Sequence, residues 1–461
     1  MKKLRLNADM TEGPLLPNII MYTIPIILTG VLQLTFNAAD LIVVGRFCGS
    51  ESVAAVGATS ALVTLLVNLF IGLSGGAGVT LAHALGSHNE EQAKRTVHTA
   101  IPLALISGIV LTFVGFFFSE SFLSLMGTPE STLKLSSVYL KIYFLGITFN
   151  MLYNYSASIL RAAGDTKSPL LFLTVAGVIN VVLNVIFVTL FHMDVAGVAL
   201  ATTLSQIVSA LLITRALIKR DDCCHLDIKA FKITKPELLK ILRIGIPSGV
   251  QGSLFSISNV LIQSSVNSFG VEFMSGSAAA ANIEGFVYIT QNAFYHSALN
   301  FSGQNTGAKN YKRVRKAFFI CLMLVTLVGF SLGALVCLFA KPLLSIYITD
   351  STAAIEAGVV KLMFVCLPYF LCGLMEVSTG ALRGMGVSLS TMVISLLGAC
   401  GFRILWIYTI FQTPQFHTGA GLFVSYPISW LLTFATQFIL FLFVYYKRTK
   451  KERELLYEVK K

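Results

Sequence analysis

Long apolar runs, separated by short polar stretches, occupy most of the chain. A helix needs about 20 apolar residues to cross a hydrocarbon core of roughly 30 Å, so each run predicts a spanning helix. The Gly and Ala residues inside the runs favour helices over a barrel, because a spanning segment must satisfy its own backbone polar groups. Twelve helices are predicted, over residues 15–44, 53–82, 95–118, 134–160, 168–190, 195–218, 236–268, 277–306, 315–339, 352–382, 388–411 and 419–446.

The composition supports this interpretation. Of the 461 residues, 55% are hydrophobic and only 12% are charged, whereas a soluble domain carries about 25% charged residues. We therefore expect an all-α, multi-pass integral protein of the cell membrane. Residues 1–13 are polar and basic without a cleavable signal pattern, so we expect them to remain in the mature chain.

The net charge of +12 reflects topology rather than nucleic-acid binding. With the N-terminus inside, 28 of the 34 Lys and Arg residues fall on predicted cytoplasmic ends and loops. This bias is the positive-inside rule, and it predicts that both termini are cytoplasmic. One further cation, Arg403, lies within a predicted helix, and five are assigned to outer ends: Arg46, Lys134, Lys141, Lys341 and Lys361.

Neither a metal nor a catalytic centre is indicated. Of the eight cysteines, most lie in apolar helices, and the Cys223–Cys224 pair with His225 lacks the second ligand pair of a zinc site. The chain has no paired His/Asp cluster on a helix and no exposed Ser–His arrangement. We therefore predict free thiols, no cofactor and no enzymatic activity.

The chain repeats itself across its longest polar stretch. Pro25 and Pro247 correspond in the segments MYTIPIILTGV and LRIGIPSGVQG. Arg161 and Arg383 correspond in SILRAAGDTKSP and GALRGMGVSLST, and the two pairs have the same separation along the chain. The segments ALGSHNEEQAKR and NTGAKNYKRVRK add a third match at almost that separation, between Asn89 and Asn310, so coincidence is a poor explanation.

The repeat predicts two pseudo-symmetric six-helix lobes. Because six is an even number, both halves start on the same side, so the repeat axis runs along the membrane normal. Such lobes form a substrate cleft between them for alternating access. The predicted divisions are an N-lobe at 1–218, an inter-lobe cytoplasmic loop at 219–235, a C-lobe at 236–446 and a basic cytoplasmic tail at 447–461.

Polar residues at helical spacing predict an ion site in the N-lobe. Asn37 and Asp40 lie one turn apart at the top of a stripe that also contains Thr29 and Gln33. A stripe on the fifth helix contains Thr174, Gly177, Asn180 and Asn184. Carboxylate and amide oxygens suit a proton or a small hard cation. The alternative is a structural carboxylate near the headgroups, because Asp40 lies about 37 Å along the helix from Leu15.

The C-lobe carries different candidates for a substrate cleft. Glu284, Tyr288 and Gln291 share one face of the eighth helix, and Glu376 lies on a polar face of the tenth. Arg403 lies in the middle of the eleventh helix. The alternative is that Glu284 or Glu376 neutralises Arg403 in a structural ion pair. The remaining substrate-cleft candidates are Asn259 and Gln263 on the seventh helix and Gln33 in the N-lobe.

From about residue 14 to 446 the chain resembles the MATE (multidrug and toxic compound extrusion) transporters, on the TIP/GIP, RAAGDT and ALRGMG segments and Asp40. The resemblance places the family's first-helix Asp on Asp40 and its fifth-helix polar pair on Asn180 and Asn184. Related sequences often carry Asp at the latter position. The C-lobe acids of NorM-like members fall near Phe255 and Cys372, so that cation site is absent, with Glu376 as a partial replacement.

The resemblance implies a monomeric antiporter that exports small organic compounds, often cationic and amphipathic, in exchange for H⁺ or Na⁺. A lipid-linked saccharide flippase of the same superfamily is the alternative, and it should show a cationic central cleft for pyrophosphate. A membrane receptor is a weaker alternative, since it needs no repeated lobes. A channel would not need them either. The expected partners are the lipid bilayer and a small-molecule substrate.

Overall fold

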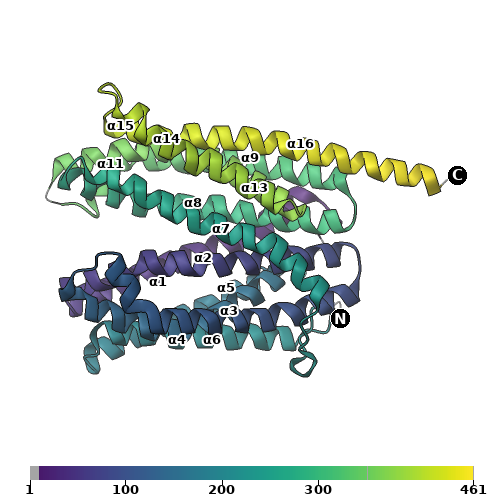
Figure 1. The fold of residues 1–461 in the computed structure, drawn as a ribbon, viewed down its shortest axis with the longest axis horizontal. Helices are drawn as coiled ribbons and strands as arrows, with labels where there is room; N and C mark the ends of the chain where they lie inside the picture. Colours follow the sequence, from purple (N-terminus) through teal and green to yellow (C-terminus); the bar gives the residue numbers. More distant parts are fainter. Residues whose placement is uncertain (1–9, 350, 460–461) are drawn as a thin grey trace. The chain divides into compact units, whose positions relative to one another are not determined.

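The computed structural model describes residues 10–349 and 351–459, and all regular structure among them is helical (Figure 1). Most of the predicted polar N-terminal stretch, 1–13, lies outside the described residues. The first half contains α1 (Leu15–Phe47), α2 (Ser50–Gly86), α3 (Glu90–Leu125), α4 (Glu130–Ala162), α5 (Lys167–Val185), the π-helix η1 (Ile186–Leu190) and α6 (Asp194–Ile218). The second half contains η2 (Ile228–Ala230), α7 (Lys235–Asn267), α8 (Val271–Gly307), α9 (Tyr311–Leu338), α10 (Ala340–Ser345), α11 (Thr352–Val365), α12 (Tyr369–Gly384), α13 (Ser388–Ser395), η3 (Leu396–Gly401), α14 (Phe402–Tyr408), η4 (Ile410–Gln412), α15 (Gly419–Phe423) and α16 (Ser425–Val459).

The helices account for the twelve predicted spans. Within the described part of the chain, nine helices are long and apolar enough to cross a membrane, and a bent pair makes ten. The helices α7 and α8 complete the twelve, although their polar positions keep them below that apolar threshold. The prediction of an all-α multi-pass membrane protein is confirmed.

Three predicted spans of the second half are interrupted. The predicted helix 352–382 is two helices, α11 and α12, bent by 46° at a break that contains Pro368. Proline has no N–H to donate and its ring crowds the preceding turn, which explains the break. The predicted helix 388–411 consists of α13, the π-helix η3, α14 and η4.

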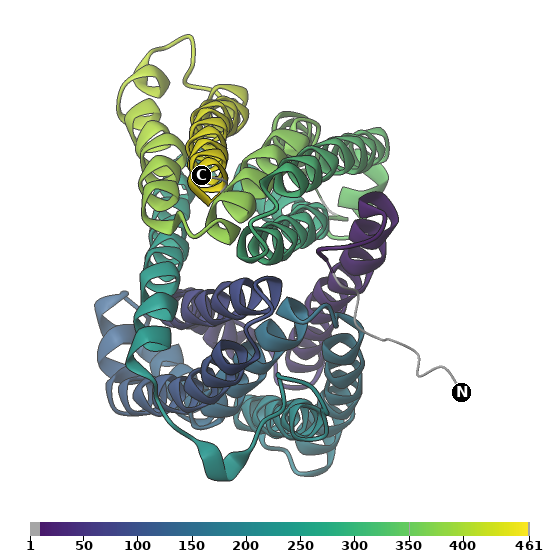
Figure 2. The same cartoon turned by 90° about the vertical axis from the view of Figure 1, so that its right-hand side faces the viewer.

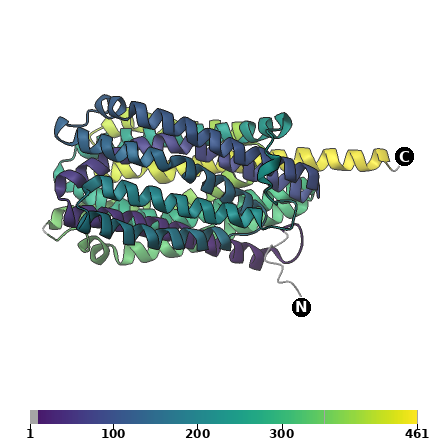
Figure 3. The same cartoon turned by 90° about the horizontal axis from the view of Figure 1, so that it is seen from below.

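The last predicted span differs at both ends. A short helix, α15, precedes α16, and α16 continues past the predicted end at residue 446 into the predicted tail. In the yellow C-terminal part of α16, which extends past the other helices of its half (Figure 3), Lys450 Nζ lies 3.9 Å from Glu454 Oε1. An i,i+4 ion pair of this kind stabilises an exposed stretch of helix.

The described residues form two compact helical units, whose bundles are seen end-on in Figure 2. One unit takes Leu28–Ser253, and the other takes Met10–Ile27 together with the residues from Leu254 onward. The borders therefore cut through α1 and α7 rather than following the predicted inter-lobe loop. The first turns of α1 pack in the second unit, where Thr23 Oγ1 lies 2.7 Å from Ser297 Oγ.

Backbone geometry repeats at the separation found in the sequence. Gly49 and Gly270 precede α2 and α8 with φ of 94° and 92°, and Gly164 and Gly386 follow α4 and α12 with φ of 86° and 80°. Positive φ is the conformation that glycine adopts at least cost. The side chains of Asn89 and Asn310 cap α3 and α9 by accepting from Gln92 N (2.9 Å) and Arg313 N (3.1 Å). The two halves therefore share local folding signals as well as helix order.

Within the first unit, α2 and α7 meet through glycines. A Cβ atom on Gly72 would lie 2.2 Å from Gly249 N, and one on Gly76 would lie 2.4 Å from Ile241 O. Small residues allow backbones in membrane proteins to approach this closely. A Cβ atom on Gly75, by contrast, would meet nothing within 4 Å.

Gly72→Ala should destabilise the first unit by about 1–3 kcal/mol, because the added methyl group forces α2 and α7 apart. Gly75→Ala is the matched control on the same helix. It should be neutral or slightly stabilising, since alanine favours a helix. Thermal unfolding of the purified protein in detergent measures both. Equal unfolding temperatures for the two variants would contradict this packing.

Candidate functional site

Two polar centres lie in separate units, and the first lies where α1 meets α5. Gly177 provides the room, because a Cβ atom there would lie 1.8 Å from Phe36 Cε2. Asp40 follows Phe36 by one turn, and Asn180 and Asn184 follow Gly177 on the same face of α5. The close approach of the two helices therefore brings the acid and the two amides together, as the polar stripes predict.

A hydrogen-bonded chain joins these groups. Asn184 Nδ2 donates to Asp40 Oδ1 and also lies 3.3 Å from Asn180 Oδ1. Asn180 Nδ2 in turn donates to Thr202 Oγ1 on α6, at 3.3 Å. Asn180 and Asn184 are buried, with exposed fractions of 4% and 0%. The centre is therefore a partly enclosed cluster of one carboxylate and two amides.

One polar atom in this cluster is unsatisfied. Asn184 Oδ1 is buried and accepts no hydrogen bond from any described residue. A buried carbonyl oxygen without a donor is costly, and it is also a ligand for a hard cation. One predicted ion-site residue lies elsewhere: Asn37 is exposed on α1, outside the hydrogen-bonded cluster. Gln33, a predicted substrate-cleft residue, is also exposed on α1.

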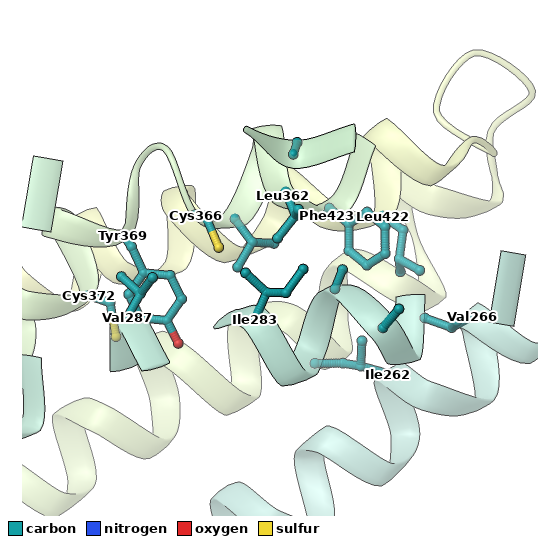
Figure 4. Close-up of a cluster of buried hydrophobic side chains, with 14 of the residues drawn as sticks. Ile262, Val266, Ile283, Val287, Leu362, Cys366, Tyr369, Cys372, Leu422 and Phe423 are labelled. Carbon is teal, nitrogen blue, oxygen red and sulfur yellow. The ribbon is translucent and has the colours of Figure 1, made fainter. Parts of the chain in front are cut away.

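The second centre is a cavity of about 410 Å³ inside the second unit. Its apolar wall includes Ile262, which lies with Ile283, Leu362 and Phe423 in one buried cluster (Figure 4). Its volume falls within the range of small-molecule sites, about 300–1,000 Å³. Six predicted substrate-cleft residues line it: Asn259, Gln263, Glu284, Tyr288, Glu376 and Arg403.

Two oppositely charged residues that line this cavity form an ion pair. Lys361 Nζ on α11 lies 3.6 Å from Glu284 Oε2 and donates to Ser277 O at 3.2 Å. The Tyr369 hydroxyl donates to Glu284 Oε1 at 3.2 Å. Lys361 lies within α11, inside the predicted helix 352–382, and is only 9% exposed. An apolar helix carries it into the cavity because Glu284 is there to neutralise it.

Arg403 is held differently. Its Nε donates to Ser429 Oγ at 2.9 Å, and its guanidinium lies 4.1 Å from the centre of the Tyr426 ring and 5.6 Å from that of Trp430. Cation–π attraction operates at these distances. Within the described residues, no carboxylate oxygen lies within 4 Å of the guanidinium. Glu284 instead pairs with Lys361, so the alternative in which it neutralises Arg403 does not describe this arrangement.

Gln291 is the predicted cleft residue that lies outside the cavity lining. It is fully buried beside Gly329 and Gly373, and neither of its amide atoms finds a partner among the described residues. A Cβ atom on Gly373 would lie 2.1 Å from Gln291 Oε1, so this glycine makes room for the amide. The sequence spacing places Gln291 on the same helical face as Glu284, but in the structure the Gln291 side chain lies against α9 and α12.

Sequence reasoning missed several residues of the two centres. Thr202 completes the first, and Tyr369, Tyr426 and Trp430 line the second. Lys361 carried a usable signal, since it is the one lysine within the apolar run GVVKLMFVC. The aromatic residues carried none, because aromatic side chains are frequent throughout the apolar helices.

The loop between α6 and α7 contains an ion pair. Arg220 Nε donates to Asp222 Oδ1 at 3.0 Å, and Asp222 Oδ1 accepts from Cys224 N at 2.9 Å. Burial opposes ionisation of Asp222, but the hydrogen bond and charge of Arg220 lower its pKa overall. Among the described residues, no group of three or more His, Cys, Asp or Glu side chains is arranged to hold a metal ion.

Comparison with known proteins agrees with the repeat. The sequence profile of the MatE family matches two segments of the chain, residues 25–186 and 247–409, which start at the corresponding prolines Pro25 and Pro247. The chain is 27% identical over 443 residues to the probable multidrug resistance protein YoeA of Bacillus subtilis, covering 94% of both chains. It is 26% identical over 405 residues to an FAD transporter of Shewanella oneidensis, covering 87% of this chain and 88% of that one.

The fold agrees with a solved structure. The outward-facing conformation of a multidrug resistance MATE family transporter of the MOP superfamily superimposes with a TM-score of 0.89, at 22% identity, over 98% of this chain and 100% of that one. A helical membrane protein built from two matching repeats, with a polar centre in each unit, is a transporter of the two-repeat class. The chain belongs to the MatE family.

The Glu284–Lys361 pair predicts a non-additive pattern of stability. Lys361→Met leaves a partly buried carboxylate without its cation, which costs about 3–5 kcal/mol in buried pairs. The double variant Glu284→Gln/Lys361→Met removes both charges and should recover most of that loss. Thermal unfolding in detergent measures the cycle, with exposed Lys341→Met on α10 as a control for loss of a positive charge. A double variant as unstable as the summed single variants would contradict the pairing.

Proposed function

We propose that this transporter is a secondary active antiporter of the cell membrane, which exports small organic compounds in exchange for H⁺ or Na⁺. The ion binds at Asp40, beside Asn180 and Asn184 in the first unit. During alternating access, the six predicted residues that line the cavity of the second unit contact the substrate. Gln291 supports this surface from behind the cavity rather than within it. Gln33, on α1 in the first unit, remains a separate candidate for substrate contact.

The observation that carries the proposal is the unsatisfied Asn184 Oδ1 beside the Asp40 carboxylate. A cation placed there would gain two kinds of oxygen ligand at once, and a proton would neutralise the carboxylate. Either event neutralises the charge of Asp40, which lies in a largely apolar environment. The packing of α1 against α5 and α6 then differs between the loaded and the empty state, which is what coupling requires.

The energy available is sufficient for export. One charge that moves inward at 100 mV supplies about 2.3 kcal/mol. At about 1.4 kcal/mol per tenfold change, that sustains roughly a forty- to fiftyfold substrate gradient when coupling is complete. The absence of a second carboxylate at Asn184 limits the site to one compensating charge, so we propose one H⁺ or Na⁺ per cycle.

Asp40→Asn should abolish gradient-driven efflux while leaving the fold intact, because asparagine keeps the shape but cannot exchange the charge. Efflux from proteoliposomes is measured under an imposed ΔpH and, separately, an imposed Na⁺ gradient, with a panel of organic cations and organic anions. Glu120→Gln removes an exposed acid of α3 and should leave efflux unchanged. Efflux at the full rate in Asp40→Asn would show that the carboxylate is not the coupling group.

A further inference from the structure

The repeat places residues of different charge at some corresponding positions of the two units. Counting forward from the starts of the two matched segments, Asn37 on α1 corresponds to Asn259 on α7, so the amide is kept. Asp40 corresponds to Ile262, which lines the cavity of the second unit. The acid of the first centre therefore has no counterpart on α7.

The facing helix shows the converse change. The ends of the two matched segments lie one residue further apart than their starts, and counting back from those ends, Asn180 on α5 corresponds to Arg403 on α14. Both helices adjoin a π-helix: η1 follows α5 just beyond Asn184, and η3 ends just before Arg403. Asn180, whose amide is hydrogen-bonded to the Asn184 side chain that contacts Asp40, thus corresponds to the guanidinium of Arg403 in the second unit. At these corresponding positions an acid has become an apolar side chain, and a neutral amide has become a cation.

The guanidinium is arranged to hold a ligand. Arg403 is 5% exposed and lines the cavity, and its Nε is fixed by Ser429 while its face rests on Tyr426. Its two terminal nitrogens donate to no described residue. A planar guanidinium fixed in this way binds an oxyanion through two parallel hydrogen bonds.

The other charged groups of the cavity restrict the ligand. Glu284 and Lys361 neutralise each other at 3.6 Å. Glu376 on α12 lines the same cavity, and no cationic nitrogen of a described residue lies within 4 Å of it. A ligand held by Arg403 therefore shares the cavity with one carboxylate, which repels a second negative charge. Tyr288, Tyr369 and Trp430 offer aromatic surface for the rest of the molecule.

We propose that the cavity of the second unit binds aromatic monocarboxylates, with the ligand carboxylate on the terminal nitrogens of Arg403. The ring system lies against the aromatic wall, and Glu376 disfavours dianions such as phosphate monoesters. This proposal goes beyond the antiport proposed above and does not require ion coupling at Asp40.

The test uses equilibrium dialysis of the purified full chain with radiolabelled 1-naphthoate, with the neutral 1-naphthalenemethanol and the dianionic 1-naphthyl phosphate for comparison. Protein-free micelles supply the background. The wild-type chain should bind naphthoate at least tenfold more tightly than the alcohol, because charge-assisted hydrogen bonds exceed neutral ones in strength. Arg403→Gln should abolish that preference, and Arg403→Lys should weaken it by keeping the charge without the planar pair of donors.

The matched control is Arg315→Gln, since Arg315 also lies over a tyrosine ring of the second unit, 5.6 Å from Tyr445, but does not line the cavity. It should bind naphthoate as the wild type does.

Glu376→Gln should raise the affinity for naphthyl phosphate several-fold. Equal wild-type affinities for naphthoate and the alcohol would overturn the proposal even if Arg403→Gln fails to fold. A naphthoate preference that survives in folded Arg403→Gln would also overturn it. Unchanged phosphate affinity in Glu376→Gln would refute the role of Glu376.

Discussion

A carboxylate inside a membrane-spanning helix must be neutralised or solvated, and this constraint shapes the first unit. An Asp at the centre of such a helix costs about 2.5–3.5 kcal/mol on insertion scales. The hydrogen bond from Asn184 offsets part of that cost for Asp40 and leaves the amide oxygen of Asn184 without a donor. A centre that is incompletely satisfied in this way gains from a proton or cation. The unsatisfied oxygen of Asn184 is therefore unfavourable in the empty pocket, and it gives the pocket an affinity for the coupling ion.

The two halves show how one backbone plan supports different chemistry. Matching glycines before α2 and α8 and matching asparagine caps on α3 and α9 preserve the helix ends. The side chains that face the interior of each unit have changed, from Asp40 to Ile262 and from Asn180 to Arg403. Helix termini depend on local backbone conformation, whereas the polar centres depend on a few side chains. The side chains of the polar centres can therefore differ between the halves while the helices begin and end at corresponding residues.

The apolar runs predicted the spanning helices because length and hydropathy alone determine whether a segment can cross a bilayer. The spacing of Asn180 and Asn184 on one face predicted their meeting with Asp40. Periodicity did not separate Asn37, which is exposed, from Asp40 one turn away, because it gives a helical face without its depth or rotation. The Glu284–Lys361 pair joins α8 to α11, two helices that are separated in the chain by α9 and α10, a tertiary relation that no local pattern encodes. Compact units that divide α1 and α7 are likewise a property of packing rather than of loop composition.

The most direct test of the central claim is to run the cycle in reverse and measure the ion. Proteoliposomes are loaded with an exported compound, without any imposed ion gradient, and movement of H⁺ or Na⁺ against the substrate flux is recorded by a pH-sensitive dye and by ²²Na⁺. The account predicts that the wild-type chain moves one of these ions in proportion to substrate, and that Asp40→Asn moves neither. Substrate-driven ion movement of the same stoichiometry in Asp40→Asn would contradict it.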